Sequence, residues 1–93
     1  MIQSFNDKTA QAIFERQVAK RLGQDIQRAA YRKLVALHLA DKIDELRFPP
    51  GNRLEKLKGD REGQHSIRSN DQWRICFAWK EDGAHDVEIV DYH

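Results

Sequence analysis

Residues 72–79 read QWRICFAW, and this stretch decides the fold. Large apolar side chains occupy every second position, which is the pattern of a β-strand with one buried face. The face predicted to be buried carries Trp73, Ile75, Phe77 and Trp79, and the opposite face carries Gln72, Arg74, Cys76 and Ala78. We therefore expect a central strand that places Arg74 on the face away from the core.

Turn signals on both sides of this stretch predict its neighbours. Asn70-Asp71 precedes it and Asp82-Gly83 follows it, and both pairs favour tight turns. Strands are therefore expected over residues 64–69 and 85–90, with a shorter strand over 54–58 beyond the Gly-containing turn 59–63. Since short turns join antiparallel neighbours, the C-terminal half is predicted to form an antiparallel sheet.

The N-terminal half carries helical periodicity instead. Apolar residues recur at intervals of three and four over residues 8–22, after a capping Asn6 or Asp7, and again over 26–37, after a capping Asp25. Gly23 is expected to end the first helix. A short first strand is expected within residues 1–5. Residues 1–93 are thus predicted to form a single α+β domain, in which two helices pack on one face of a twisted antiparallel sheet and leave at least part of the other face open.

Composition narrows the class of protein. Hydrophobic residues make up 40% of the 93 residues and charged residues 33%, which is typical of a folded globular chain. No apolar run approaches the roughly 20 residues that span a bilayer, and the first eight residues, MIQSFNDK, do not resemble a signal peptide. Cys76 is the single cysteine, so no internal disulfide can form. We expect a cytoplasmic protein with no membrane association.

The net charge of +1 is unevenly distributed along the chain. Residues 1–46 hold eight Lys/Arg against six Asp/Glu, residues 47–74 hold seven against four, and residues 75–93 hold one against five. The middle block therefore carries a positive excess that would suit a phosphate-bearing partner. Such a run is also common on an ordinary solvated surface, so charge alone leaves the choice open.

The sequence IVDYH, residues 89–93, places three reactive side chains directly after a predicted strand. Asp91 and His93 share a face with His85, and the three side chains are of the types that bind metals. However, His85 and His93 would lie roughly 26 Å apart along one strand. No pair such as CxxC or HxxxH supplies further ligands, so no metal and no other cofactor is expected.

A second interpretation joins this terminal segment to cations on the sheet. Arg74 lies on the outer face, and Lys58 lies one hairpin away from it. If Asp91, Tyr92 and His93 approached them, cations, a phenol and an imidazole could surround one phosphate. That set could cleave RNA, because a base can deprotonate a ribose 2′-OH while cations neutralise the phosphorane and an acid protonates the leaving oxygen. The residues alone leave their convergence open.

Residues 54–93, LEKLKGDREGQHSIRSNDQWRICFAWKEDGAHDVEIVDYH, resemble the C-terminal half of the HigB toxins, which belong to the RelE/ParE toxin superfamily. The resemblance rests on LKGDREG, on the strand entry NDQWRI and on the final DYH, and the preceding strand and helix pair suit the family as well. It implies a microbial-RNase-like fold and a toxin of a type II toxin–antitoxin module. The implied activity is a ribosome-dependent mRNA endonuclease that cuts mRNA in the ribosomal A site.

The resemblance also implies roles for individual residues. Lys58 and Arg74 match basic residues that bind and neutralise the scissile phosphate, and Asp91, Tyr92 and His93 match the family's C-terminal active-site residues. His93 is then the best candidate for proton transfer, and Tyr92 is expected to orient a nucleotide or stack on it. Three further cations of the basic middle block are expected to bind RNA: Lys56, Arg61 and Arg68.

Partners follow from the same resemblance: the small ribosomal subunit with its mRNA, and a neighbouring helix-turn-helix antitoxin similar to HigA. The free toxin is expected to be monomeric and its antitoxin complex oligomeric. One position departs from the pattern, since some relatives have a histidine where this chain has Glu55, whose carboxylate could act as a base instead. A ParE-like inhibitor of DNA gyrase, a non-catalytic RNA-binding domain and a pure interaction module remain alternatives.

Overall fold

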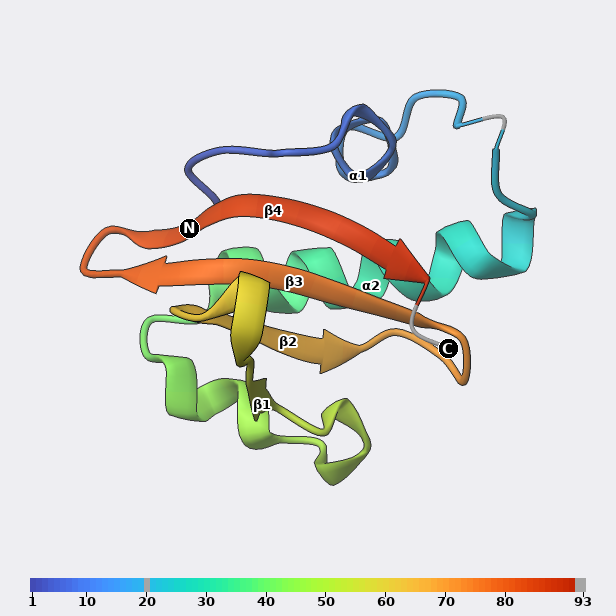
Figure 1. The fold of residues 1–93 in the computed structure, drawn as a ribbon. Coiled ribbons are helices and arrows are strands. Elements are labelled where there is room, and N and C mark those ends of the chain that lie inside the picture. The colour runs from blue at the N-terminus through green and yellow to red at the C-terminus, as the bar shows by residue number, and fades with distance from the viewer. Residues whose placement is uncertain (20, 92–93) are drawn as a thin grey trace.

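The computed structural model describes residues 1–19 and 21–91. Its centre is an antiparallel four-stranded sheet in the order β1-β2-β3-β4 (Figure 1). The strands are β1 (Glu55–Lys56), β2 (Gln64–Arg68), β3 (Trp73–Lys80) and β4 (Gly83–Asp91). The helices are α1 (Lys8–Phe14) and α2 (Gln24–Leu39), and three 3₁₀ turns are η1 (Ile43–Arg47), η2 (Pro50–Asn52) and η3 (Gly59–Arg61). Both helices pack on the same side of the sheet, so the predicted α+β class is confirmed.

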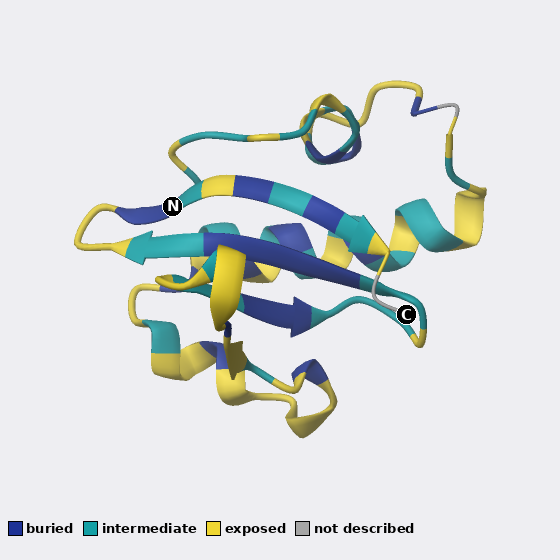
Figure 2. Cartoon of the chain, viewed as in Figure 1, coloured by how far each residue is buried: buried dark blue, intermediate teal, exposed yellow. Residues whose placement is uncertain are grey.

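Strand β3 is the centre of the core, and both of its faces are covered. Ile75 and Phe77 are fully buried against the helices, and Ile67 of β2 and Ile89 of β4 lie opposite Ile75 in register. The dark segments in Figure 2 follow β3 and its neighbours. Trp73 and Trp79 are partly buried against this core, as the alternating pattern predicts.

The first residues extend the sheet beyond β4. Ile2 and Phe5 form isolated parallel bridges with Ala84 and Val87, in place of the short strand expected there. Asp7 then ties this segment to both neighbours: Oδ1 accepts a hydrogen bond from the Thr9 amide at 2.8 Å and caps α1, while Oδ2 accepts one from the Ile89 amide at 3.1 Å. The capping role predicted for Asp7 is confirmed.

The first helix is shorter than the predicted span of residues 8–22, because a capping motif ends it at Phe14. The Gln17 amide bonds to the Ala12 carbonyl and the Arg16 amide to the Ile13 carbonyl, which is the Schellman pattern of helix termination. Arg16 takes the left-handed conformation, with φ of 59°, at the position where glycine is favoured. Arginine has a high helix propensity, so the residue types at this position did not predict that α1 ends at Phe14.

The residue predicted to end the first helix begins the second. Gly23 has φ of −63° and is the N-cap of α2, so Asp25 lies within the first turn and is not its cap. The buried residues Ala30, Leu34 and Leu37 follow the predicted spacing. In the described part of the chain, no helix is long and apolar enough to cross a membrane.

The outer face of the sheet is more covered than expected. Strand β1 contains two residues where five were predicted, and the chain then crosses the sheet as η3, in front of β3 in Figure 1. Ser66 and Cys76 on this face are therefore fully buried. Both tight hairpin turns form as predicted, and Gly83, with φ of 126°, is required because a Cβ there would lie 1.9 Å from the Met1 carbonyl oxygen.

Candidate active site

Arg74 is the organising residue of the outer face. Only 7% of it is exposed, and its guanidinium is held by neighbouring chain. Nε donates to Ser66 Oγ at 2.8 Å, and Nη2 donates to the carbonyl oxygens of Arg53 at 2.6 Å and Ser66 at 3.3 Å. A charge is costly to bury unless hydrogen bonds satisfy it, and these acceptors meet that requirement. These hydrogen bonds also fix the direction of the guanidinium.

Beside Arg74 lies a polar hollow of about 310 Å³. Its described lining combines three guanidinium groups with two carboxylates and one amide: Arg53, Arg68, Arg74, Glu55, Asp71 and Asn70. The excess of cations suits an anionic ligand, and the acceptor-rich rim suits hydroxyl groups such as those of ribose. The hollow therefore has the chemistry of a site for one phosphate and its sugar.

The two carboxylates of the hollow differ in position. Asp71 pairs with Arg68 at the β2–β3 turn, and its side chain is 97% exposed. The carboxylate of Glu55 lies 4.0 Å from Arg74 Nη2 and is half exposed. Of these two carboxylates, only that of Glu55 lies within 4.0 Å of the buried Arg74 guanidinium. Asp71 is instead paired with Arg68.

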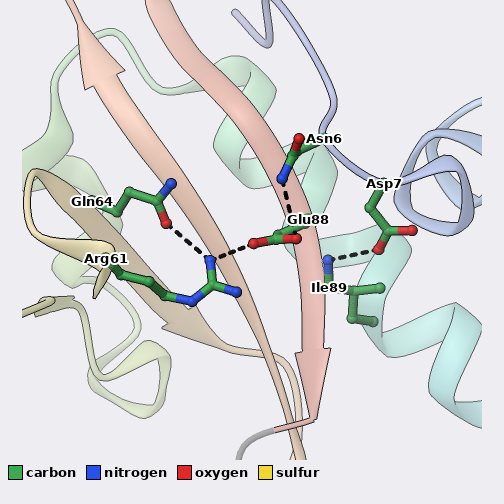
Figure 3. A network of polar contacts seen from close by, with 6 residues as sticks. All are labelled: Asn6, Asp7, Arg61, Gln64, Glu88 and Ile89. Carbon is green, nitrogen blue, oxygen red and sulfur yellow. Dashed lines mark hydrogen bonds and ion pairs between the residues drawn. The ribbon is translucent and has the colours of Figure 1, made fainter. Parts of the chain in front are cut away.

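A second network crosses the outer face and fixes η3 there (Figure 3). Arg61 pairs with Glu88 of β4 and also donates to Gln64 Oε1 at 3.1 Å, while Asn6 Nδ2 reaches the other oxygen of Glu88 at 3.5 Å. Cys76 lies beneath this network, and burial raises the pKa of its thiol. The thiol is thus a packed neutral group, and Arg61 fastens the segment that carries Lys58.

Two more of the predicted basic residues, like Arg61, lie outside the described lining of the hollow. Lys58 is exposed and is the N-cap of η3, three residues before Arg61, and it is not among the described residues that line the hollow. Lys56 lies opposite His65 in register, whereas Glu55 lies opposite Ser66. Alternation therefore places Lys56 on the opposite sheet face from Arg74.

Asp91 ends β4 at the same end of the sheet as Arg74. It lies opposite Trp73, and its Oδ2 accepts a hydrogen bond from Gln72 Nε2 at 3.1 Å. Register places Val90 opposite Arg74, so the last described residue is one position from it. Tyr92 and His93, the other two residues predicted for this site, lie outside the described residues.

The described histidines and acids outside the hollow do not form a metal site. Across residues 1–19 and 21–91, no three His, Cys, Asp or Glu side chains lie close enough to hold a metal ion. His85 instead contacts Asp82 at 2.6 Å, and this hydrogen bond lowers the pKa of the Asp82 carboxyl. His38 Nδ1 accepts a hydrogen bond from the Ile2 amide at 3.1 Å, which is a structural role.

Sequence reasoning missed three residues that shape the site. Ser66 and the Arg53 carbonyl hold Arg74, and Glu88 holds Arg61. The pairing of β2 with β3 could have revealed Ser66, since it lies opposite Cys76, the next outer-face residue after Arg74. A backbone carbonyl leaves no signal in the sequence. Glu88 could have been predicted to form an ion pair, because an acid within a half-buried strand requires a partner.

Comparison with known proteins connects this site to a family. The family model described as "RelE-like toxin of type II toxin-antitoxin system HigB" matches residues 3–93. Toxin HigB-1 of Vibrio cholerae is 41% identical over 80 residues, which cover 85% of this chain and 84% of that protein. Endoribonuclease HigB of Proteus vulgaris is 38% identical over 94 residues, which cover 100% of each.

Proposed function

The chain belongs to the HigB family of RelE-like toxins from type II toxin–antitoxin systems, and on that premise we propose that it is an endoribonuclease that cuts mRNA on the ribosome. A toxin of this class has an antitoxin as its partner. The single observation that carries the proposal is the fixed guanidinium of Arg74 beside a polar hollow at the end of β4. The name Endoribonuclease HigB of a relative matched over its whole length supports the same reaction.

The proposed reaction begins with attack of a ribose 2′-OH on the adjacent phosphorus. Arg74 neutralises the charge that grows on the phosphate oxygens, and Lys58, exposed at the N-cap of η3 outside the hollow, supplies a second cation. His93 transfers a proton, Tyr92 orients or stacks on a nucleotide, and Asp91 completes the C-terminal set. The bond to the 5′-oxygen breaks as that oxygen gains a proton, which leaves a cyclic phosphate and a free 5′-hydroxyl.

Glu55 receives a role where some relatives have histidine. Its carboxylate, 4.0 Å from Arg74 Nη2, accepts the proton of the 2′-OH as general base. Glu55→Gln keeps the shape and removes the basicity, so the cleavage rate should fall by roughly 10²- to 10⁴-fold. Asp44→Asn is the matched control, because that carboxylate is 79% exposed and pairs with Arg47 outside the hollow. Equal rates in Glu55→Gln and the wild type would remove Glu55 from the mechanism.

The activity is tested by incubating the protein with purified ribosomes that translate a defined mRNA and mapping the new 5′ ends. Cleavage is expected within codons, with His93→Ala inactive and still folded. If no new ends appear and DNA gyrase cleavage complexes accumulate instead, the chain is a ParE-like gyrase inhibitor and the nuclease proposal is wrong.

The cellular setting completes the proposal. The toxin acts in the cytoplasm, where the small ribosomal subunit presents mRNA in the A site. The antitoxin is a helix-turn-helix protein similar to HigA, and toxin and antitoxin form an oligomer although the free toxin is monomeric. Co-expression with the adjacent gene, followed by light scattering of both species, tests these assignments. A free toxin that elutes as a dimer would contradict the monomer.

A further inference from the structure

A basic groove lies on the helix side of the sheet, between the end of α1 and the first half of α2. It encloses about 530 Å³. Its described lining is mostly cationic or amide-bearing: Ile13, Arg16, Gln17, Gln24, Gln27, Arg28, Tyr31 and Arg32. Arg74 and its hollow lie on the other face of the sheet, so this groove is a separate surface.

The three arginines of the groove belong to the most positively charged stretch of the sequence. Residues 16–33 hold six Lys/Arg against one acid, Asp25, whereas residues 47–74 hold seven against four. Ion pairs enlarge this contrast. Four cations of the middle block form ion pairs, namely Arg47, Arg61, Arg68 and Arg74. Among the described residues, none of Arg16, Arg28 and Arg32 forms one. The described lining of the groove therefore combines three cations without an ion pair and no acid.

The groove is formed before any partner arrives. Gln27 Nε2 donates to the Ala19 carbonyl at 2.8 Å and to the Leu22 carbonyl at 2.6 Å, which ties the connection after α1 to α2. The guanidinium of Arg16 lies 4.7 Å from the centre of the Tyr31 ring. Arg28 and Arg32 are four residues apart on α2, so they share a helix face and repel each other in the free protein. A rigid groove with repelling cations favours an anionic occupant.

The chemistry of the lining distinguishes RNA from a protein segment. A docked helix would need apolar anchors, but Ile13 is only 4% exposed and Arg16 covers the Tyr31 ring. Guanidinium groups bind phosphate through paired hydrogen bonds, and glutamine amides bind phosphate and sugar oxygens. We infer that this groove binds the phosphate backbone of ribosomal RNA that is not cleaved, while the Arg74 face holds the message. The inference deepens the proposed function and rests on it.

The test measures binding of the protein to purified small ribosomal subunits over a series of salt concentrations. Arg28→Glu/Arg32→Glu should weaken binding roughly 10- to 100-fold, and the slope of log K against log salt should fall by about one unit for each phosphate that the variant no longer binds. Arg28→Lys/Arg32→Lys keeps the charge and should retain most of the slope. A circular dichroism spectrum of the reversed variant that matches the wild type would show that it is folded, and binding by the lysine variant would then assign its loss of binding to charge.

A matched control exists at another hollow, where Lys42 and Lys80 are balanced by Asp41 and Glu81. Ile43 and Trp79 complete its described lining. Lys42→Glu/Lys80→Glu alters the net charge by the same amount as the groove variant, and it should bind subunits as the wild type does. Equal weakening by both variants would overturn the inference, because the effect would then be one of overall charge.

The remaining outcomes separate this inference from the proposed function. If the wild type cleaves mRNA and the groove variant binds subunits normally, the groove inference is wrong and the nuclease stands. If the groove variant loses binding to subunits but the wild type never cleaves, the groove stands and the nuclease is wrong. If the groove variant binds subunits normally and no longer binds the antitoxin, the groove belongs to the protein partner and the RNA assignment is overturned.

Discussion

Arg74 serves the fold and the site with one guanidinium. Its described acceptors come from β2 and from the segment before β1, so it joins three parts of the outer face. Removal of the side chain would remove the donor that Arg74 supplies to the buried Ser66 hydroxyl and to the Arg53 and Ser66 carbonyls, which costs stability as well as activity. A substitution to alanine therefore cannot separate the two roles, and a charge-preserving change is the sharper probe.

Arg74→Lys is expected to lower both the rate of cleavage and the stability of the fold. A lysine keeps the charge but lacks the planar fork that reaches the Ser66 hydroxyl and the Arg53 carbonyl together. The rate should fall about 10²- to 10³-fold, and the free energy of unfolding should fall by about 1–3 kcal/mol. Cleavage on ribosomes and denaturant unfolding measure the two effects. Arg47→Lys, on the surface, should change neither, and a fully active Arg74→Lys would contradict the assignment.

His65 gives a second prediction at the residue scale, in the pH dependence of stability. Burial lowers the pKa of His65, and the nearby positive charges of Lys56 and Arg47 lower it further. The ring stacks on Phe77 with 6.2 Å between centroids. The unfolded chain therefore binds the proton more tightly than the folded chain, so stability is present above the unfolded pKa of about 6.5 and is lost as pH falls below it.

The measurement is urea unfolding at about pH 7.5 and about pH 5.5, on either side of that value. The wild type should lose stability at the lower pH, and His65→Phe should lose less, because it keeps the stacking and removes the titrating ring. The difference between the two proteins isolates His65 from the other histidines. An identical loss in both proteins would rule His65 out.

At the scale of elements, sequence patterns predicted the strands around β3 better than the two ends of the sheet. Strands β2, β3 and β4 could be predicted from the alternation over residues 72–79 and from the turns Asn70-Asp71 and Asp82-Gly83. Both signals are local, because they depend on neighbouring residues alone. The end of α1 at Phe14 and the crossing of η3 were not predicted. The end of α1 rests on an arginine in the left-handed conformation, which composition does not signal, and the crossing of η3 rests on the distant contact of Arg61 with Glu88.

The Arg61–Glu88 pair is predicted to position the segment that carries Lys58. Arg61→Glu or Glu88→Arg alone opposes like charges in a partly buried site, so each should lower stability and cleavage. The double exchange, Arg61→Glu/Glu88→Arg, restores the pair and should recover part of both losses, with a coupling free energy of roughly 0.5–3 kcal/mol. Unfolding curves and the KM for ribosomes report it.

The exposed pair Arg47–Asp44 is the matched control for this exchange. Its side chains are 63% and 79% exposed, so its coupling should be near zero. Recovery of stability without recovery of cleavage would contradict the positioning role, because the pair would then hold the fold alone.

At the scale of the whole molecule, the distribution of charge in space differs from the distribution along the chain. The middle block was the predicted surface for an anionic partner, yet four of its cations are engaged in ion pairs. The net charge of residues 16–33 was counted together with the acids of the rest of residues 1–46. A count over a shorter segment would have shown the positive excess of residues 16–33. The pairing itself could not be predicted, because it depends on which elements the fold brings together.

The two proposed RNA-binding faces lie on opposite sides of one sheet and should act independently. Arg74→Lys weakens the chemistry on the outer face, and Arg28→Glu/Arg32→Glu weakens the grip of the groove. Because the two sets share no described contact, their effects on the free energy derived from kcat/KM should add in the combined variant to within about 0.3–0.5 kcal/mol. The measurement is the rate of mRNA cleavage at ribosome concentrations below KM. A combined variant no worse than Arg74→Lys alone would mean that both sets bind the same stretch of RNA, and that the protein has one extended site in place of two.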